Sequence, residues 1–247
     1  FPNTLLHFDV GRDRSKKALE EAMNHDQIVF LVAQKDVRSD NPQPDELCKT
    51  GTISRVKQIL KLPGGGIRVM VEGIARGRAR AYLRFDPFCE AMVSEIESDT
   101  GDTEKAAPIV RYVKELYGEY VQLSPHTDPE NMLEVIANTA PDFLADYIAQ
   151  NTGLQYLDKQ KVLDELSPYK RIELVAALLA REIQILKAEI DIQNKVKEQL
   201  DKNQKDYVLR EQLRAIKTEL GEQEDASDEA REYTERIKAL NIDPDSE

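Results

Sequence analysis

The longest uninterrupted stretch of this chain lies between Pro168 and Gly221, because residues 169–220 contain neither glycine nor proline. Proline is favoured at the first position of a helix and glycine just beyond its last turn, so these two residues mark a start and a stop. Ser167, directly before the proline, is a suitable N-cap. The pattern predicts one continuous α-helix about 80 Å long, far longer than a compact domain of this size needs.

The two halves of this stretch carry different patterns. In the first half, apolar residues recur at steps of three and four, which predicts a stripe packed against a partner surface. The stripe consists of Ile172, Val175, Leu179, Ile183, Leu186 and Ile190. In the second half, acidic residues precede basic residues by four positions, an arrangement that stabilises an exposed helix by ~0.2–0.5 kcal/mol per pair. The pairs are Asp191–Lys195, Glu198–Lys202, Asp201–Lys205 and Asp206–Arg210. We therefore predict a docked first half and a solvated strut; the alternative is a helix packed along its whole length in a bundle.

Composition limits the classes of function that remain. A net charge of −12 argues against a general nucleic-acid binder. Much of the negative charge lies in residues 221–247, which hold 10 acidic and 3 basic residues. The cysteines, Cys48 and Cys89, show no CxxC spacing, which predicts reduced thiols in a cytoplasmic protein rather than a disulfide. No apolar run approaches ~18 residues, so no membrane span is predicted. The chain opens at Phe1 without an initiator methionine, which indicates a fragment.

The first hundred residues read as a sheet with one helix. Strands are predicted at Leu5–Val10, within 27–34, on both sides of the turn at 63–66, at 73–84 and at 88–96. The helix after Gly11 has Asp13 or Ser15 as its cap, and the glycines of the turn supply positive φ for a hairpin. The run 48–62 is long for one strand, so a bulge or bend is expected inside it. Residues 97–104 are polar and acidic and form the best internal boundary.

Helical patterns follow this boundary. They predict helices within 104–123, after Asp128, from Pro141 and within 158–166, ahead of the long helix. Beyond Gly221, Ala230, Tyr233, Ile237 and Leu240 form a short stripe that could fold back along the long helix as an antiparallel coiled-coil arm. The alternative for this segment is a frayed acidic tail.

Catalytic motifs are missing from the sequence. It has no phosphate-binding P-loop, no HExxH spacing and no GxSxG elbow, so no catalytic, cofactor-binding or metal-binding residue is predicted. Arg76, Arg78 and Arg80 share one strand face by the period of two and would suit an acidic or phosphorylated partner. Because the aromatic interleaving of a nucleic-acid site is absent, we favour a solvated sheet face with edge protection instead.

Several motifs together resemble a known family. They are Asp9–Arg12 with Ser15, Glu20–Met23, Phe30–Gln34, Gly51–Thr52, Lys57–Pro63 (KQILKLP), Gly66–Arg76 (GIRVMVEGIAR), Asp158–Gln160 and Tyr207–Gly221 (YVLREQLRAIKTELG). This set, spread over essentially the whole chain, resembles the amino-terminal, substrate-recognition region of bacterial Lon, the ATP-dependent protease family. The last of these motifs is similar to the Lon segment that leads into the ATPase module.

The resemblance implies an α+β fold with a PUA-like β lobe at 1–98, a helical lobe at 99–166 and a long stalk helix at 167–221. The remaining segment, 222–247, is the acidic arm, for which the coiled-back helix and the frayed tail both stay open. It also implies that the family's first strand precedes Phe1 and that the Walker motifs and the Ser–Lys dyad follow Glu247. ATP and magnesium are then cofactors of the parent protein, with none in this fragment.

The function implied by the resemblance is capture of unfolded or degron-bearing proteins by a cytoplasmic homohexamer, an ATP-dependent serine protease that degrades misfolded, damaged and short-lived regulatory proteins. The long helix would set the capturing head above the ATPase ring; neither membrane nor nucleic acid is an expected partner. The candidate substrate-contact residues are Phe1, Pro2, Leu5, Asp13, Arg14 and Lys17. The alternatives are an oligomerisation scaffold with little client affinity and a stand-alone adaptor that binds a partner helix.

Overall fold

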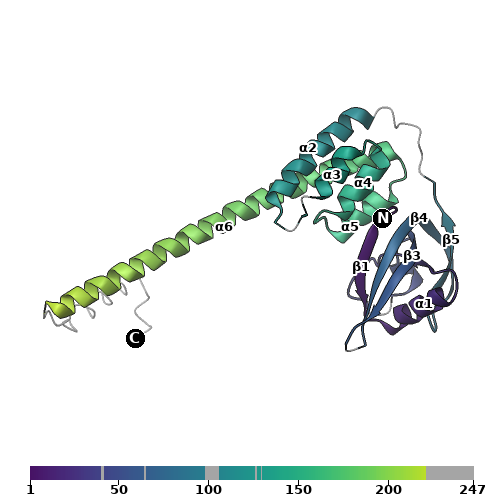
Figure 1. Ribbon diagram of the computed structural model, residues 1–247, viewed down its shortest axis with the longest axis horizontal. Coiled ribbons are helices and arrows are strands. Elements are labelled where there is room, and N and C mark those ends of the chain that lie inside the picture. The colour runs from purple at the N-terminus through teal and green to yellow at the C-terminus, as the bar shows by residue number, and fades with distance from the viewer. Residues whose placement is uncertain (40–41, 64, 98–105, 126, 129, 221–247) are drawn as a thin grey trace, which may run out of the picture. The chain divides into compact units, whose positions relative to one another are not determined.

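A computed structural model describes residues 1–247 except 40–41, 64, 98–105, 126, 129 and 221–247. It divides into two compact units, Phe1–Lys187 and Ala188–Glu247, which we describe separately. The fold is mixed α+β, with an antiparallel sheet first and helices after it (Figure 1). The predicted arm at 222–247 and the predicted boundary loop lie outside the described residues, apart from Glu97.

The sheet of the first unit is built from five strands and carries one helix. In chain order the elements are β1 (Leu5–Val10), α1 (Asp13–Asn24), β2 (Ile28–Leu31), the short 3-10 helix η1 (Pro44–Glu46), β3 (Thr50–Lys61), β4 (Ile67–Arg84) and β5 (Glu90–Glu95). The strand order is β1-β4-β3-β2, with β5 pairing the later part of β4, and every pairing is antiparallel. Gly65 has a φ of 81° in the β3–β4 turn, which only glycine adopts without strain. The predicted irregularity in β3 is confirmed by the register shift between Val56 and Gln58, where Lys57 has no partner in the ladder.

Helix α1 is where a local prediction was wrong. Neither Asp13 nor Ser15 caps it: Arg12 occupies the N-cap position and no side chain there bonds the first-turn amides. Leu19 and Ala22 of α1 are buried, whereas Met23 is exposed. Burial of two residues against the sheet is therefore enough to hold this helix, since tertiary packing contributes more to a helix than its cap does.

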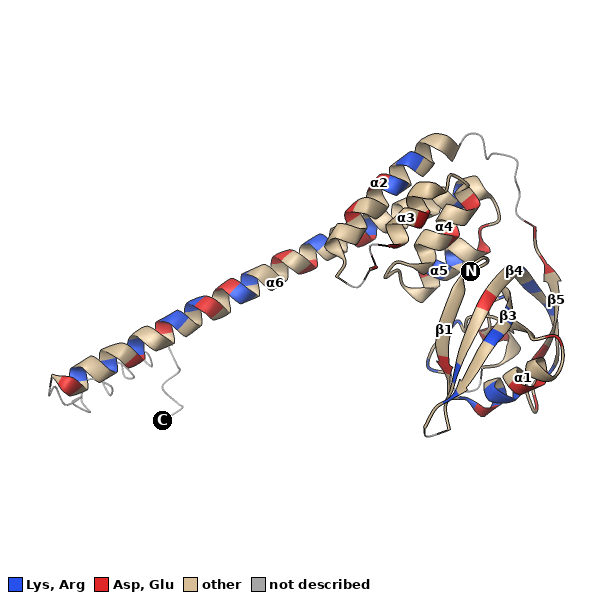
Figure 2. Ribbon diagram, viewed as in Figure 1, with Lys and Arg blue, Asp and Glu red and all other residues tan. Residues whose placement is uncertain are grey.

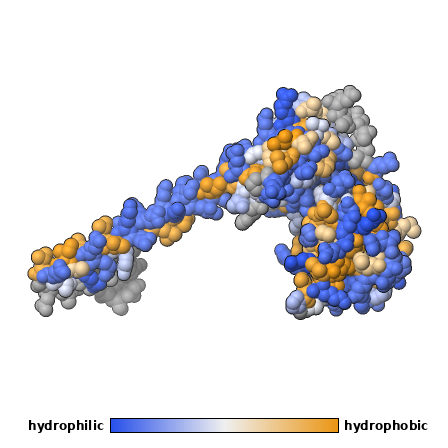
Figure 3. Space-filling model, viewed as in Figure 1, coloured by the Kyte–Doolittle hydropathy of each residue, from blue (hydrophilic) through white to orange (hydrophobic). Residues whose placement is uncertain are grey.

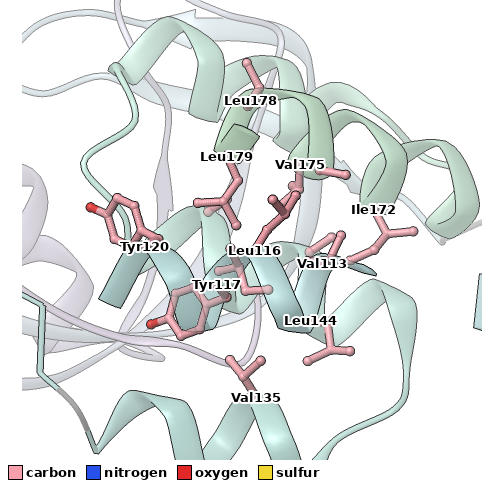
Figure 4. Close-up of a cluster of buried hydrophobic side chains, with 14 of the residues drawn as sticks. Val113, Leu116, Tyr117, Tyr120, Val135, Leu144, Ile172, Val175, Leu178 and Leu179 are labelled. Atoms are coloured by element: carbon pink, nitrogen blue, oxygen red, sulfur yellow. The ribbon is translucent and has the colours of Figure 1, made fainter. Parts of the chain in front are cut away.

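The remaining helices of the first unit pack around the start of the long helix. They are α2 (Ala107–Leu123), α3 (Asn131–Ala137), α4 (Pro141–Gln150), α5 (Tyr156–Asp164) and α6 (Pro168–Glu219). Their shared core contains Val113 and Tyr117 from α2, Leu144 from α4, and Ile172 and Leu179 from α6, all fully buried (Figure 4). Ile183 extends the α6 stripe into this core and Leu186 packs against it. The predicted stripe is thus docked from Ile172 to Leu186.

Helix α6 runs without a break from Pro168 to Glu219, 52 residues, which confirms the continuous helix read from the sequence. In the second unit every described residue from Asp191 onward is exposed, so the alternative of a fully packed helix is wrong. Lys, Arg, Asp and Glu alternate along this part (Figure 2). Among the described residues, however, none of the four predicted acid–base pairs approaches within 4.0 Å. Exposed pairs gain little against side-chain entropy, so helix propensity supports this segment instead.

Two tyrosines of α2, Tyr117 and Tyr120, should respond differently to substitution by phenylalanine. The Tyr120 hydroxyl accepts a hydrogen bond from the Gly153 amide at 2.8 Å, whereas the buried Tyr117 hydroxyl has no partner among the described residues. Burial raises the pKa of Tyr117 well above its usual range, so the group stays neutral. We expect Tyr120→Phe to lower the free energy of unfolding by about 1 kcal/mol and Tyr117→Phe to leave it unchanged or raise it. Urea denaturation of both variants checks this; equal losses would contradict it.

Candidate functional site

The two faces of the sheet have different surroundings. Ile67, Val69 and Val71 of β4 point to one face and are buried in a core that Leu19 of α1 covers. The residues that alternate with them point to the other face, since successive side chains of a strand lie on opposite sides. Antiparallel sheets commonly have one packed and one solvated face, and the solvated one is then polar. Here the uncovered face departs from that rule.

Four apolar side chains mark this second face, which we call the outer face. They are Leu5 of β1, Leu60 of β3, and Met70 and Ile74 of β4; Leu5 is 61%, Leu60 50% and Ile74 41% exposed. The register places Leu5 beside Glu72 and Leu60 beside Arg68, so Met70 lies between them. Ile74 follows at an irregularity in the β3–β4 ladder. Figure 3 shows apolar residues interspersed with polar ones at the surface of this part of the molecule.

Two ion pairs frame these apolar residues. Arg68 Nε donates to Asp9 Oδ1 at 2.6 Å, and Lys57 Nζ lies 2.6 Å from Glu72 Oε2. The hydrogen bond from Arg68 lowers the pKa of Asp9, and the one from Lys57 lowers the pKa of Glu72. Both carboxylates therefore stay charged at pH values below their usual titration range, and the ion pairs are lost only as the pH falls through the lowered pKa values. Around neutral pH the face presents these two ion pairs, the exposed Arg55 beside Glu72, and exposed apolar surface that an apolar ligand can cover.

The structure does not bring the six predicted contact residues into one site. Leu5 is exposed on the outer face, Pro2 is buried, and Phe1 is half-buried against the helical core. Asp13, Arg14 and Lys17 lie in the first turns of α1, and Asp13 pairs with Lys16 at 3.5 Å. The two groups flank β1, whose six residues span about 17 Å. Of these candidates, Leu5 is the one that belongs to the outer face.

A buried network of charged side chains joins the sheet to the helices. No pattern in the sequence predicted it. Arg76 of β4 donates from Nη1 and Nη2 to the Asp146 carboxylate of α4, at 2.8 and 2.5 Å, and from Nε to the Leu163 carbonyl at 3.1 Å. Arg171 of α6 approaches the same carboxylate at 3.7 Å and donates from Nε to the Glu165 carbonyl. All three charged side chains are buried, and burial lowers the pKa of Arg171.

This network corrects the expectation that Arg76, Arg78 and Arg80 lie on a solvated face, since Arg76 is 5% exposed. A guanidinium tolerates burial when a carboxylate and carbonyls accept from its donors. The partner lies 70 residues away along the chain, so local spacing carries no sign of it. The structural consequence is a fixed connection between the sheet and the helices of the first unit.

Other site types receive no support from the described residues. No group of three or more His, Cys, Asp or Glu side chains among them is arranged to hold a metal ion. Within the same residues, no helix has the length and apolar character needed to cross a membrane. Cys48 and Cys89 are both free thiols.

The first unit is thus an α+β domain in which an antiparallel sheet with exposed apolar residues is fixed to a helical lobe. Comparison with known proteins identifies the family of this domain. Residues 1–181 match the family model for the ATP-dependent protease La (LON) substrate-binding domain. The chain is 38% identical over 247 residues to the Lon protease of Syntrophomonas wolfei, and 41% identical over 245 residues to that of Clostridioides difficile.

These alignments cover 100% and 97% of this chain but only 30% and 31% of the relatives, so the chain spans less than a third of their length. Among solved structures, the N-terminal domain of Mycobacterium avium complex Lon protease matches with a TM-score of 0.59 and 18% identity, over 72% of this chain and 91% of that one. That likeness concerns the fold alone. The chain belongs to the Lon substrate-binding domain family.

Proposed function

We propose that this chain is the client-binding region of a Lon-type ATP-dependent serine protease, and that the outer face of its sheet takes up exposed apolar segments of unfolded proteins. The observation that carries the proposal is the exposure of Leu5, Leu60 and Ile74 on a face framed by balanced ion pairs. Exposed apolar groups on a sheet offer area that a client segment can bury, at ~25 cal/mol per Å².

The parent protein supplies the rest of the activity in this proposal. Its ATPase and peptidase parts, with ATP and magnesium as cofactors, lie in the portion of the relatives that this chain does not cover. It acts as a cytoplasmic homohexamer on misfolded, damaged and short-lived regulatory proteins. The unbroken α6 supports a spacer role, in which it sets the distance between client capture and the ATPase ring.

One observation favours a second candidate function, an oligomerisation scaffold. In the second unit, α6 exposes an apolar set that nothing among the described residues covers. It comprises Ile192, Val196, Leu200, Tyr207, Val208, Leu209, Leu213 and Ile216, and Leu220 directly beyond the helix is exposed as well. Apolar residues at steps of three and four on a helix are typical of helix–helix association between chains. A chain acting chiefly through this surface would self-associate and bind clients poorly.

Sedimentation velocity separates the two functions. The chain is run at several concentrations, with and without reduced, dephosphorylated casein as an unfolded client. We expect casein to co-sediment with the chain even at concentrations where the chain alone is monomeric. Concentration-dependent assembly without casein binding would support the scaffold and contradict client capture.

A further inference from the structure

A second surface of the first unit has the opposite character to the outer face. It is a pocket where β3, β4 and the end of α5 meet, and its charged lining consists of Lys35, Lys49, Arg78, Arg80 and Asp164. Four cations thus face one carboxylate, although the chain as a whole carries a net charge of −12. A local excess of one sign in a concave site concentrates its field and attracts ligands of opposite charge.

Two of these cations are available for a ligand. Lys35 Nζ donates to the Asp45 carbonyl at 2.6 Å, and Arg80 Nε donates to Ser94 Oγ at 2.8 Å. The side chains of Lys49 and Arg78, by contrast, have no hydrogen bond or ion pair with any described residue. Arg78 is also half-buried, and a partly desolvated cation without a counter-charge gains from binding an anion.

The strands hold these cations in place before any ligand arrives. Arg78 is paired with Thr50 across the β3–β4 ladder, and the Ala79 amide donates to the Lys49 carbonyl at 2.9 Å. Gln160 of α5 donates from Nε2 to both the Thr50 carbonyl and Asp164, at 3.1 and 3.0 Å, which fixes the opposite wall. The backbone that carries these cations is therefore fixed before a ligand binds.

The spacing of the cations favours an extended chain over a single small anion. Arg78 and Arg80 line the pocket from β4, where the β4–β5 ladder shifts register between Ala79 and Ala81, and Lys49 precedes Thr50, the β3 partner of Arg78. An extended acidic peptide such as Glu-x-Glu carries carboxylates roughly 7 Å apart on one face, so it can reach more than one of these cations. The additional cations at Lys35 and Lys49 lie on separate segments and widen the charged area beyond the reach of one oxyanion.

We propose that this pocket binds acidic segments of client proteins, through carboxylates that pair with Arg78 and Lys49. This rests on the proposed client-binding function and adds a second determinant to it, an acidic stretch in addition to an apolar one. Asp164 opposes such binding by its charge and so limits the affinity of the pocket.

Fluorescence anisotropy with two labelled unstructured peptides tests the proposal directly. One peptide has a Glu-x-Glu-x-Glu block in a Gly/Ser background, and its control has Gln in place of Glu. We expect the Glu peptide to bind the chain at least tenfold more tightly, with affinity falling as salt rises from about 0.05 to about 0.3 M. Lys49→Gln/Arg78→Gln should weaken its binding about tenfold, and Asp164→Asn should strengthen it about twofold. Removing two exposed cations elsewhere, Lys170→Gln/Lys195→Gln, should change it less than twofold.

Cys48 lines the same pocket and reports where the peptide binds. In a Cys89→Ser chain, the Glu peptide should slow alkylation of Cys48 by iodoacetamide and the Gln peptide should not; alkaline buffer is needed because burial raises the pKa of this thiol. Equal binding of both peptides, unchanged binding by Lys49→Gln/Arg78→Gln, or displacement by submillimolar inorganic phosphate would overturn the proposal. If any of these results is obtained and the chain still binds a neutral apolar peptide, only the acidic-segment proposal fails. If the chain does not bind the neutral apolar peptide either, the proposed client-binding function fails as well.

Discussion

Replacing Asp146 by alanine should destabilise the first unit by about 3–5 kcal/mol, because it leaves two buried guanidinium groups without their carboxylate. Arg76 makes both Nη contacts to Asp146, and Arg171 lies 3.7 Å from it. The expected loss is a large part of the stability of an ordinary domain. Urea unfolding followed by circular dichroism measures it as a shift of the midpoint at constant slope.

Two further variants show whether the cause is the buried charge. Asp142→Ala removes an exposed carboxylate from the first turn of the same helix and should cost less than about 1 kcal/mol. Arg76→Met combined with Asp146→Leu should recover part of the loss, since an apolar pair of similar volume replaces a buried ion pair at little cost. A loss below about 1 kcal/mol for Asp146→Ala would mean that this network does not hold the sheet to the helices.

The long helix and the hairpin were predictable because their signals are local. A stretch without glycine or proline, bounded by Pro168 and Gly221, specifies a helix by sequence neighbours alone, and α6 follows it closely. The β3–β4 turn is similar, since Gly65 supplies the positive φ that the turn requires. Family resemblance added the overall class of fold, which the comparisons confirm.

The sites were not predictable in the same way, because they depend on contacts between distant residues. Arg68 and Asp9 are 59 residues apart, and Arg76 and Asp146 are 70 apart. The position of α1 determines which face of β4 is covered. Because α1 packs on the face of Val69 and Val71, Leu60 and Ile74 remain exposed. Hydrophobic alternation identified the strands but could not say that both of their faces carry apolar residues.

The second large effect concerns the outer face. Substituting Leu5, Leu60 and Ile74 together by glutamine should weaken binding of a neutral apolar client peptide at least tenfold, since each side chain contributes buried apolar area to the complex. All three are exposed in the free chain, so the free energy of unfolding should change by less than about 1 kcal/mol. A matched control removes three comparably exposed apolar residues from α6, Ile192, Val196 and Leu200, by the same substitution.

The most direct measurement is therefore the affinity of one labelled, unstructured peptide, rich in leucine and phenylalanine and free of acidic residues, for these three chains by fluorescence anisotropy. Because the peptide carries no carboxylate side chains, the basic pocket adds little to its binding. The account predicts at least a tenfold loss for the outer-face variant and less than a twofold change for the α6 variant. Equal affinity for the unaltered chain and the outer-face variant, or a loss confined to the α6 variant, would contradict it.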